Sequence, residues 1–329
     1  LNGGIANTYE YDGNIISKNT VTGITLGNIA TVTGIATTAI GAYASETITN
    51  NQVRNLSIVP ALSSTNTHVL RGIVTTGAAS ALKNINNNLV DSLYTSSTAN
   101  AIVTGIQQTG GGAGATVNVF KNKIQNLFPG QAAALGVSYA RGIAATSGIN
   151  VNIHNNMIAL DYSLAFAPAA NAVINNADGL KGIEITGGTN MNVYYNTIRL
   201  GGTGLTLFGA SGIGVTSLTP VITLKNNIIV NACTRIGATG FAVAFRRFPG
   251  ILTNYSTASN NNLFFAGTPS INNFLFYNGT GYQDLATLVP VVTPRETASV
   301  EGPLPANFFL SIVNPIDLRV NTANSCLVD

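Results

Sequence analysis

A short motif of apolar and polar positions recurs along most of the chain. In its clearest copy, an aliphatic residue is followed by two spacers, an asparagine, one spacer and a second apolar residue, as in Ile153, Asn156 and Ile158. The eight asparagines of this motif, here called the spine asparagines, are Asn19, Asn51, Asn88, Asn122, Asn156, Asn196, Asn227 and Asn262. Successive members lie 31 to 40 residues apart. An internal repeat of this period is typical of solenoid proteins.

The positions that flank the spine asparagines are apolar in nearly every copy. Two residues after the asparagines stand Val21, Val53, Val90, Ile124, Ile158, Ile198, Ile229 and Phe264. Three residues before them stand Ile16, Ile48, Ile85, Val119, Ile153, Val193, Leu224 and Ser259, of which only the last is not aliphatic. Alternation of apolar and polar residues around these positions predicts short strands that bury one face.

A second motif runs in phase with the first. Gly-Ile pairs occur at residues 34–35, 72–73, 105–106, 142–143, 182–183 and 212–213, and the isoleucine of each pair lies 13 to 16 residues before the next spine asparagine. We expect three strands per repeat: one that begins at Gly-Ile, one that ends before the asparagine and one that follows it. Stacked repeats of this kind form an all-β parallel β-helix of about eight coils.

The recurring asparagine has a physical explanation in such a stack. A side-chain amide at the bend between the second and third strands can donate to one coil and accept from the next, so that identical amides form a ladder. Asparagine also tolerates left-handed backbone angles. The alternative is that asparagine merely suits a turn, but the apolar residue two positions after every copy argues for a buried ladder.

The motif divides the chain into two parts. Residues 1–266 carry the repeats, whereas from about residue 267 the spine stops and Pro, Phe and Tyr become more frequent. We interpret residues 267–329 as C-terminal closing coils of the same domain and expect them to be truncated. Since strand-like sequence stands at both ends and the open ends of a β-helix need covering, we expect this chain to be part of a longer polypeptide or an assembly.

Composition narrows the function classes. Charged residues make up 8% of the chain and hydrophobic residues 45%, with a net charge of +3 and 35 glycines. This composition is typical of neither a disordered nor a helical protein. No apolar run approaches 18 residues, so we predict no membrane insertion. The one adjacent basic pair, Arg246 and Arg247, is interpreted as an exposed rim at a turn, and no nucleic acid is expected as a partner.

Together the repeats and the tail resemble the secreted right-handed parallel β-helix proteins, the pectate-lyase-like superfamily. The tail elements are Tyr282-Gln283-Asp284-Leu285, Ser299, Phe308 and Asp317-Leu318-Arg319-Val320, which look like the last coils of that family. The composition, with few charged residues and many Asn, Thr and Gly, is similar to that of bacterial surface proteins exported by the type IX secretion system. The resemblance implies a right-handed helix and an extracellular or cell-surface location.

The catalytic residues of enzymes in the pectate-lyase-like superfamily can be compared with the residues of this chain. Hydrolases of that superfamily carry adjacent aspartates and a Gly-His-Gly element, neither of which occurs here, and its lyases use an acidic calcium cluster with a basic residue. The charged candidates are Asp91, Asp161, Asp178, Glu184, Lys181 and Arg199. Asp161 and Arg199 follow successive spine asparagines, so a salt bridge between them is favoured over a calcium site. The two histidines, His68 and His154, lack metal-type spacing, as do Cys233 and Cys326.

We therefore predict no catalytic, cofactor-binding or metal-binding residue, and no cofactor. We favour a role as a structural or adhesive segment of a large secreted or cell-surface protein. The expected partners are surface polysaccharides or other components of the cell surface and the secretion system. The alternatives are a polysaccharide lyase or glycoside hydrolase, or a carbohydrate-binding module. Asp91-Ser92-Leu93 resembles a bacterial O-glycosylation motif, which makes Ser92 a candidate for modification.

Overall fold

The computed structural model describes most of the chain in a series of segments. These are residues 5–9, 13–27, 30–39, 45–59, 67–77, 82–96, 100–112, 114–130, 138–161, 174–204, 206–235, 239–247, 250, 252–321 and 323.

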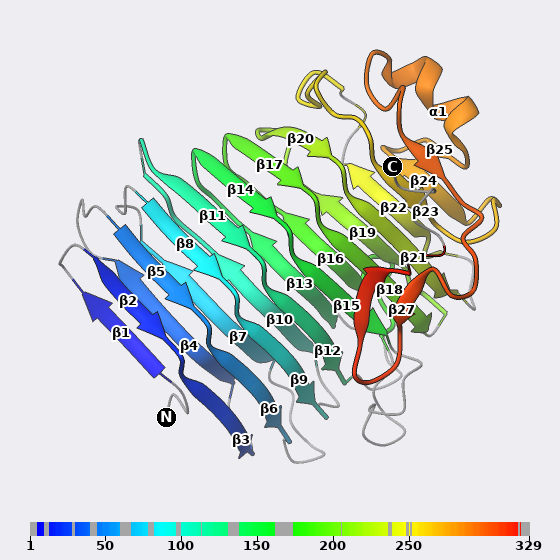
Figure 1. The fold of residues 1–329 in the computed structure, drawn as a ribbon. Helices are drawn as coiled ribbons and strands as arrows, with labels where there is room; N and C mark the ends of the chain where they lie inside the picture. The colour runs from blue at the N-terminus through cyan, green and yellow to red at the C-terminus, as the bar shows by residue number, and fades with distance from the viewer. Residues whose placement is uncertain are drawn as a thin grey trace.

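Three sheets of stacked strands form the body (Figure 1). Sheet A contains β1 (Ile5–Tyr9), β4 (Thr31–Ala39), β7 (His68–Thr76), β10 (Ala101–Gln108), β13 (Tyr139–Ala145), β16 (Leu180–Ile185), β19 (Ala210–Val215), β22 (Ala242–Arg247), β24 (Asn273–Tyr277) and β25 (Gly281–Tyr282). Sheet B contains β2 (Asn14–Ser17), β5 (Ser45–Thr49), β8 (Leu82–Asn86), β11 (Thr116–Phe120), β14 (Asn150–His154), β17 (Asn190–Tyr194) and β20 (Val221–Lys225). Sheet C contains β3 (Thr20–Leu26), β6 (Gln52–Ile58), β9 (Leu89–Thr95), β12 (Lys123–Pro129), β15 (Met157–Asp161), β18 (Thr197–Thr203), β21 (Ile228–Thr234), β23 (Leu263–Phe265) and β26 (Val300–Glu301).

The order of the strands confirms a parallel β-solenoid. The chain visits sheets A, B and C in turn, and each strand pairs in parallel with its counterpart one coil later, as β11 does with β8 and β14. Seven coils, from β1–β3 to β19–β21, have all three strands in the described residues. The eighth has β22 and β23, with only isolated bridges to Tyr255 and Asn260 in place of a sheet B strand. The expected eight coils are thus seven complete ones and a partial eighth.

The first strand of each coil begins earlier than expected, because the Gly-Ile pair lies within the strand. In β13 the glycine is Gly142, the fourth residue of the strand. A Cβ atom there would lie 2.6 Å from the Gly182 carbonyl oxygen and 2.6 Å from Cγ2 of Ile158. Since such contacts are too close for carbon, only glycine lets the strand lie against both the neighbouring coil and the apolar residue that follows the spine asparagine.

Rows of aliphatic side chains fill the interior. The isoleucines of the Gly-Ile pairs, Ile35, Ile73, Ile106, Ile143, Ile183 and Ile213, are fully buried and stack in register across sheet A. The residues two positions after the spine asparagines form a second such row from sheet C. Burial of this apolar surface is the main stabilising contribution of the body.

A short helix closes the C-terminal end of the solenoid. Helix α1 (Leu285–Val292) begins at Asp284, whose side chain accepts a hydrogen bond from the Thr287 backbone N–H. Leu288 and Val292 are buried in the main core, so the helix covers the last coils (Figure 1). The strands β24 and β26 continue sheets A and C on either side of it. The proposed division of the chain at residue 267 stays a prediction.

The last described elements leave the solenoid path. Strands β27 (Phe309–Ser311) and β28 (Asp317–Val320) form an antiparallel hairpin that is a sheet by itself. Its apolar residues pack on the outer face of sheet C (Figure 1).

Candidate functional site

The eight spine asparagines form one continuous ladder between sheets B and C. Each Nδ2 donates to the Oδ1 of the asparagine in the following coil, at 2.9–3.0 Å, from Asn19 to Asn262. The same Oδ1 also accepts the backbone N–H of the preceding asparagine, as Asn156 does from Asn122 at 3.1 Å. From Asn51 onward, Nδ2 donates a second bond to a backbone carbonyl of the previous coil, such as that of Val119 for Asn156. The ladder therefore satisfies buried polar groups of three coils at once.

The left-handed backbone conformation falls on the residue before each spine asparagine. These residues are Lys18, Asn50, Asn87, Lys121, Asn155, Tyr195, Asn226 and Asn261, with φ between 53° and 59°. The expectation that the spine asparagine itself exploits this conformation was wrong. Asparagine is needed at the spine for its amide, while the bend is made one residue earlier, where even Tyr195 adopts it.

The ladder ends on a buried carboxylate. Asn262 Nδ2 lies 2.9 Å from Oε2 of Glu296, and its backbone N–H donates to Oγ of Ser299 at 2.9 Å. Glu296 is 1% exposed and also accepts hydrogen bonds from the Tyr255 and Ser299 hydroxyls. Burial raises the pKa of Glu296, an effect that these donors oppose without cancelling. Ser299 thus takes the acceptor position that a ninth asparagine would occupy.

The raised pKa of Glu296 predicts a pH-dependent contribution to stability. A carboxyl whose folded pKa lies above its ordinary value of 4.5 binds more protons in the folded state, so its contribution is present below that value and is lost as the pH rises through the folded pKa. We expect Glu296→Gln to flatten this decline in denaturant unfolding across the acidic to neutral range. Asp317, with a lowered pKa, should contribute with the opposite sign, so Asp317→Asn is the control. An unchanged pH slope in the Glu296 variant would contradict this assignment.

An ion pair lies inside the first coils. Lys83 Nζ is 3.1 Å from Oε2 of Glu46, and the two side chains are 0% and 2% exposed. They lie in register at an inward position of sheet B that Val117, Val151 and Met191 occupy in later coils. Among the described residues, no hydrogen bond reaches either carboxylate oxygen of Glu46. Lys83 is therefore the group that compensates its charge. Sequence reasoning missed this pair, although both residues stand five positions before a spine asparagine.

A second group of charges lies on the outer face of sheet A. We call it the charged patch, and it consists of Arg71, Arg141, Asp178, Lys181, Glu184 and Arg246. Three of its cations, Arg71, Arg141 and Lys181, stand immediately before the glycine of a Gly-Ile pair and so fall in one row across the sheet. Thr104 stands between Arg71 and Arg141 in this row. Neighbouring strands of a sheet lie about 4.8 Å apart, so Arg141 and Lys181 are neighbours and Arg71 lies one strand further away.

Ion pairs connect most of the patch. Lys181 Nζ lies 3.1 Å from Oε1 of Glu184 and 3.3 Å from Oδ2 of Asp178. Arg141 pairs with Oε2 of the same glutamate, and Arg246 Nε lies 3.4 Å from Oδ1 of the same aspartate. The Tyr139 ring lies beneath Arg141 and Lys181, with centroid distances of 4.9 and 5.4 Å. Two carboxylates thus face four cations, which leaves the patch with an excess of positive charge.

The electrostatics of the patch hold its lysine protonated. Burial by itself would lower the pKa of Lys181, but the carboxylates of Asp178 and Glu184 outweigh burial and raise it. Arg71 has no carboxylate partner among the described residues, and burial together with Arg141 lowers its pKa. Its Nε makes no hydrogen bond to the described residues. The patch can therefore attract an anion, whereas a neutral lysine able to accept a proton is disfavoured.

The structure brings together only some of the charged candidates. Asp178, Lys181 and Glu184 meet in the patch, while Asp91 lies on sheet C. The expected salt bridge between Asp161 and Arg199 is confirmed, also on sheet C. Sequence reasoning missed Arg71, Arg141 and Arg246 as members of the patch. The position before each Gly-Ile glycine was the signal that could have found Arg71 and Arg141.

Two aromatic positions differ in how they lie. His154 is outward, and its ring stacks on that of Phe120 at 5.0 Å. Burial, followed by the charge of Lys121, lowers the His154 pKa. Neither Tyr194 nor Tyr195 faces the core, because Val193 takes the inward position.

Ser92 stands at an irregularity shared by the first coils of sheet C. It has φ 56°, and Gly23, Asn55 and Asn126 hold the equivalent left-handed position in neighbouring strands. The Ser92 hydroxyl lies 3.0 Å from Oδ1 of Asp91. Its modification by a glycan stays a prediction.

The adjacent arginines do not form an exposed rim, contrary to expectation. Both lie within β22, where alternation directs Arg246 outward to the charged patch and Arg247 inward. Arg247 is 1% exposed and donates to the Asn254 carbonyl at 3.1 Å.

The described segments contain no group of three or more His, Cys, Asp or Glu side chains arranged to hold a metal ion. The helix in these segments is too short to cross a membrane. Cys233 forms no disulfide with a described residue, and burial raises its thiol pKa strongly, while Cys326 lies outside the described residues.

Comparison with known proteins adds no relative: no family model, curated protein or solved structure matches this chain.

Proposed function

We propose that this chain is a non-catalytic structural and adhesive segment of a large secreted or cell-surface protein. The observation that carries the proposal is the asparagine ladder, which runs unbroken through eight coils and ends on the buried Glu296. Hydrogen-bonded amides that run along the whole solenoid favour a role as a rigid, elongated support. Such a support presents repeated side chains at fixed intervals, which suits contact with an extended polymer.

The charged patch is the surface that we assign to adhesion. Its excess of cations and its Tyr139 and Tyr277 rings suit an anionic or hydroxyl-rich surface polysaccharide. Arg246 lies 5.2 Å from the centroid of Tyr277, which extends the patch toward the C-terminal coils. We also propose that the chain is related to pectate-lyase-like proteins and to proteins exported by the type IX secretion system. The repeat and the amino-acid composition support this relation.

The runner-up function is a polysaccharide lyase or glycoside hydrolase at the same patch. It is favoured by the two carboxylates that flank Lys181. Against it stands the protonated state of Lys181, since a lysine that acts as a base must first lose its proton. Both carboxylates are also engaged in ion pairs with Arg141, Lys181 and Arg246, so each already has cationic partners within the patch.

One experiment separates adhesion from turnover. We expect the protein to be retained on insoluble acidic polysaccharide and to release neither reducing ends nor unsaturated sugars from pectin or alginate, with or without calcium. Retention should fall several-fold in Arg71→Gln, because no carboxylate in the described part of the chain pairs with that cation. It should be unchanged in Arg319→Gln, an exposed control on the hairpin. Turnover that is lost in Glu184→Gln would replace this proposal with the enzyme.

A carbohydrate-binding module is a second candidate, supported by a pocket at the end of sheet C. The pocket has a volume of about 460 Å³ and combines the Phe265 ring with Arg235, Asn272 and Asn273. An aromatic wall beside amide and guanidinium donors suits a single sugar unit. Asn272→Ala would weaken sugar binding there without altering retention by the charged patch.

A further inference from the structure

We infer that the C-terminal hairpin β27–β28 is an exchangeable element through which two copies of this chain pair. The hairpin forms a two-stranded sheet of its own and shares no ladder with sheets A, B or C. A lone two-stranded hairpin is marginally stable in water. The hairpin therefore depends for its stability on the sheet C surface against which it packs. That surface can belong to the same chain or to a second copy of the chain.

The surface beneath the hairpin is built for an apolar cover. At the outward positions of sheet C, the first coils carry exposed polar residues such as Gln52 and Arg54. The same positions in later coils carry Met157, Ala159, Ile228, Val230 and Leu263, with Thr197 and Arg199 as the polar residues between them. Phe308, Phe309, Ile316 and Leu318 of the tail pack on these residues. The solenoid thus has a specific receptor surface for this hairpin.

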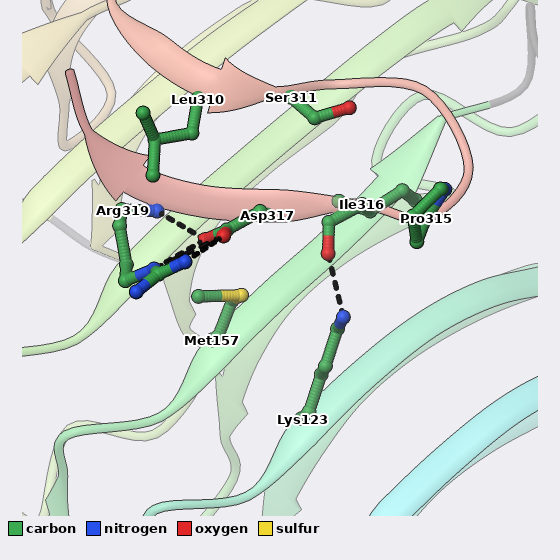
Figure 2. Close-up of a pocket in the computed structure, with 8 residues that line it drawn as sticks. All are labelled: Lys123, Met157, Leu310, Ser311, Pro315, Ile316, Asp317 and Arg319. Carbon is green, nitrogen blue, oxygen red and sulfur yellow. Dashed lines mark hydrogen bonds and ion pairs between the residues drawn. The ribbon is translucent and has the colours of Figure 1, made fainter.

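Few polar contacts fix the hairpin in place. Two hydrogen bonds from the described residues join it to the solenoid, namely Lys123 Nζ to the Ile316 carbonyl at 2.5 Å and the Leu318 N–H to Sδ of Met157 at 3.4 Å. Figure 2 shows that an opening remains between the hairpin and the sheet, and its volume is about 520 Å³. Release of the hairpin breaks no β-ladder, so the barrier to exchange is lower than for any other strand of the body.

The connection to the hairpin is long enough for exchange. Residues 302–308 join β26 to β27 and contain no strand or helix. An extended chain spans at most about 3.3–3.6 Å per residue, so this tether can carry the hairpin beyond the edge of its own solenoid. A second copy offers the same receptor surface, which is why the second copy is the occupant that we propose.

The outer side of the hairpin supports pairing. Ile312 and Val313 are 37% and 56% exposed on this small element, while Leu310, 49% exposed, lines the opening toward the sheet. In an exchanged pair, Ile312 and Val313 are available to contact the second copy. Pairing also doubles the number of polymer-binding surfaces in one particle, which increases avidity.

The test uses two single-cysteine chains in a background of Cys233→Ala and Cys326→Ala. One chain carries Met157→Cys and the other Leu318→Cys, since these residues are in contact across the receptor surface. The chains are mixed, incubated at high concentration and oxidised. We expect a disulfide-linked dimer with one chain of each kind. The control pairs Met157→Cys with Val313→Cys, on the exposed side of the hairpin, and should give none.

A second measurement keeps the proposal testable if the cysteine chains fold poorly. Light scattering on the unaltered protein should show a molar mass that rises toward two chains with concentration, and Leu318→Asp should abolish the rise. A mass of one chain at every concentration would overturn the proposal. So would a cross-link that forms only when both cysteines are in the same chain.

Discussion

Replacing Lys83 with methionine should destabilise the protein by roughly 3–5 kcal/mol, because it leaves a buried carboxylate without its counter-charge. Lys83 is fully buried and lies 3.1 Å from Glu46. In the described residues the carboxylate receives no hydrogen bond that could replace the ion pair. Denaturant unfolding of the Lys83→Met protein measures the cost directly.

The double variant Glu46→Met/Lys83→Met provides the matched control. Val117, Val151 and Met191 fill the same inward position in later coils, so the site accommodates an apolar row. Replacing both members of a buried pair with apolar residues is often neutral or stabilising. We expect the double variant to regain most of the lost stability. Equal losses in the single and double variants would show that packing, not the unpaired charge, determines the cost.

Asn156→Ala should have the second largest effect, a loss of about 3 kcal/mol. The side chain donates to Asn196 and to the Val119 carbonyl, and it accepts from the backbone and side chain of Asn122. Alanine leaves these buried partners unsatisfied, and each such group costs about 1–3 kcal/mol. Thermal or denaturant melts of the variant test the value.

An outward asparagine separates burial from amide stacking. Asn118 belongs to a second ladder on the outer face of sheet B, where it donates to Asn84 and accepts from Asn152 at 2.9 Å. Because solvent can replace these bonds, Asn118→Ala should cost less than about 1 kcal/mol. Asn171, which the sequence would also offer as a control, lies outside the described residues. Similar losses at residues 118 and 156 would mean that amide stacking contributes regardless of burial.

The sequence was sufficient for the fold and for the ladder. Period-two alternation around Asn156 and the spacing of its counterparts determine which side chains face inward, and stacking then follows from repetition. The bend was assigned to the wrong residue because both Asn155 and Asn156 are asparagine in the clearest repeat. Comparison with Lys121 and Tyr195 in other repeats shows that the left-handed position accepts other side chains.

The ion pairs were harder to predict than the strands. The repeat shows which residues occupy equivalent positions in successive coils, but not which charged side chains contact each other. Glu46 and Lys83 share a position in the repeat, but alternation alone does not say that opposite charges fill an interior position. In the patch, Arg141 and Lys181 follow from the Gly-Ile phase, whereas Asp178 precedes its strand in a connecting segment. The hairpin has no repeat phase at all, so its docking on Met157 could not be derived from local pattern.

The ladder also gives the molecule a direction. At the spine, every backbone N–H and one hydrogen of each side-chain amide point to the Oδ1 of the following coil, and at the last coil they point to Ser299 and Glu296. From Asn51 onward, the other amide hydrogen points back to a backbone carbonyl of the previous coil. A coil that forms at the amino-terminal side therefore finds acceptors for two of its spine donors, whereas a coil added at the other side finds an acceptor for only one. Growth of the rod during refolding should therefore run backward along the chain, and pulsed hydrogen exchange should show the spine amides near Asn262 protected before those near Asn19.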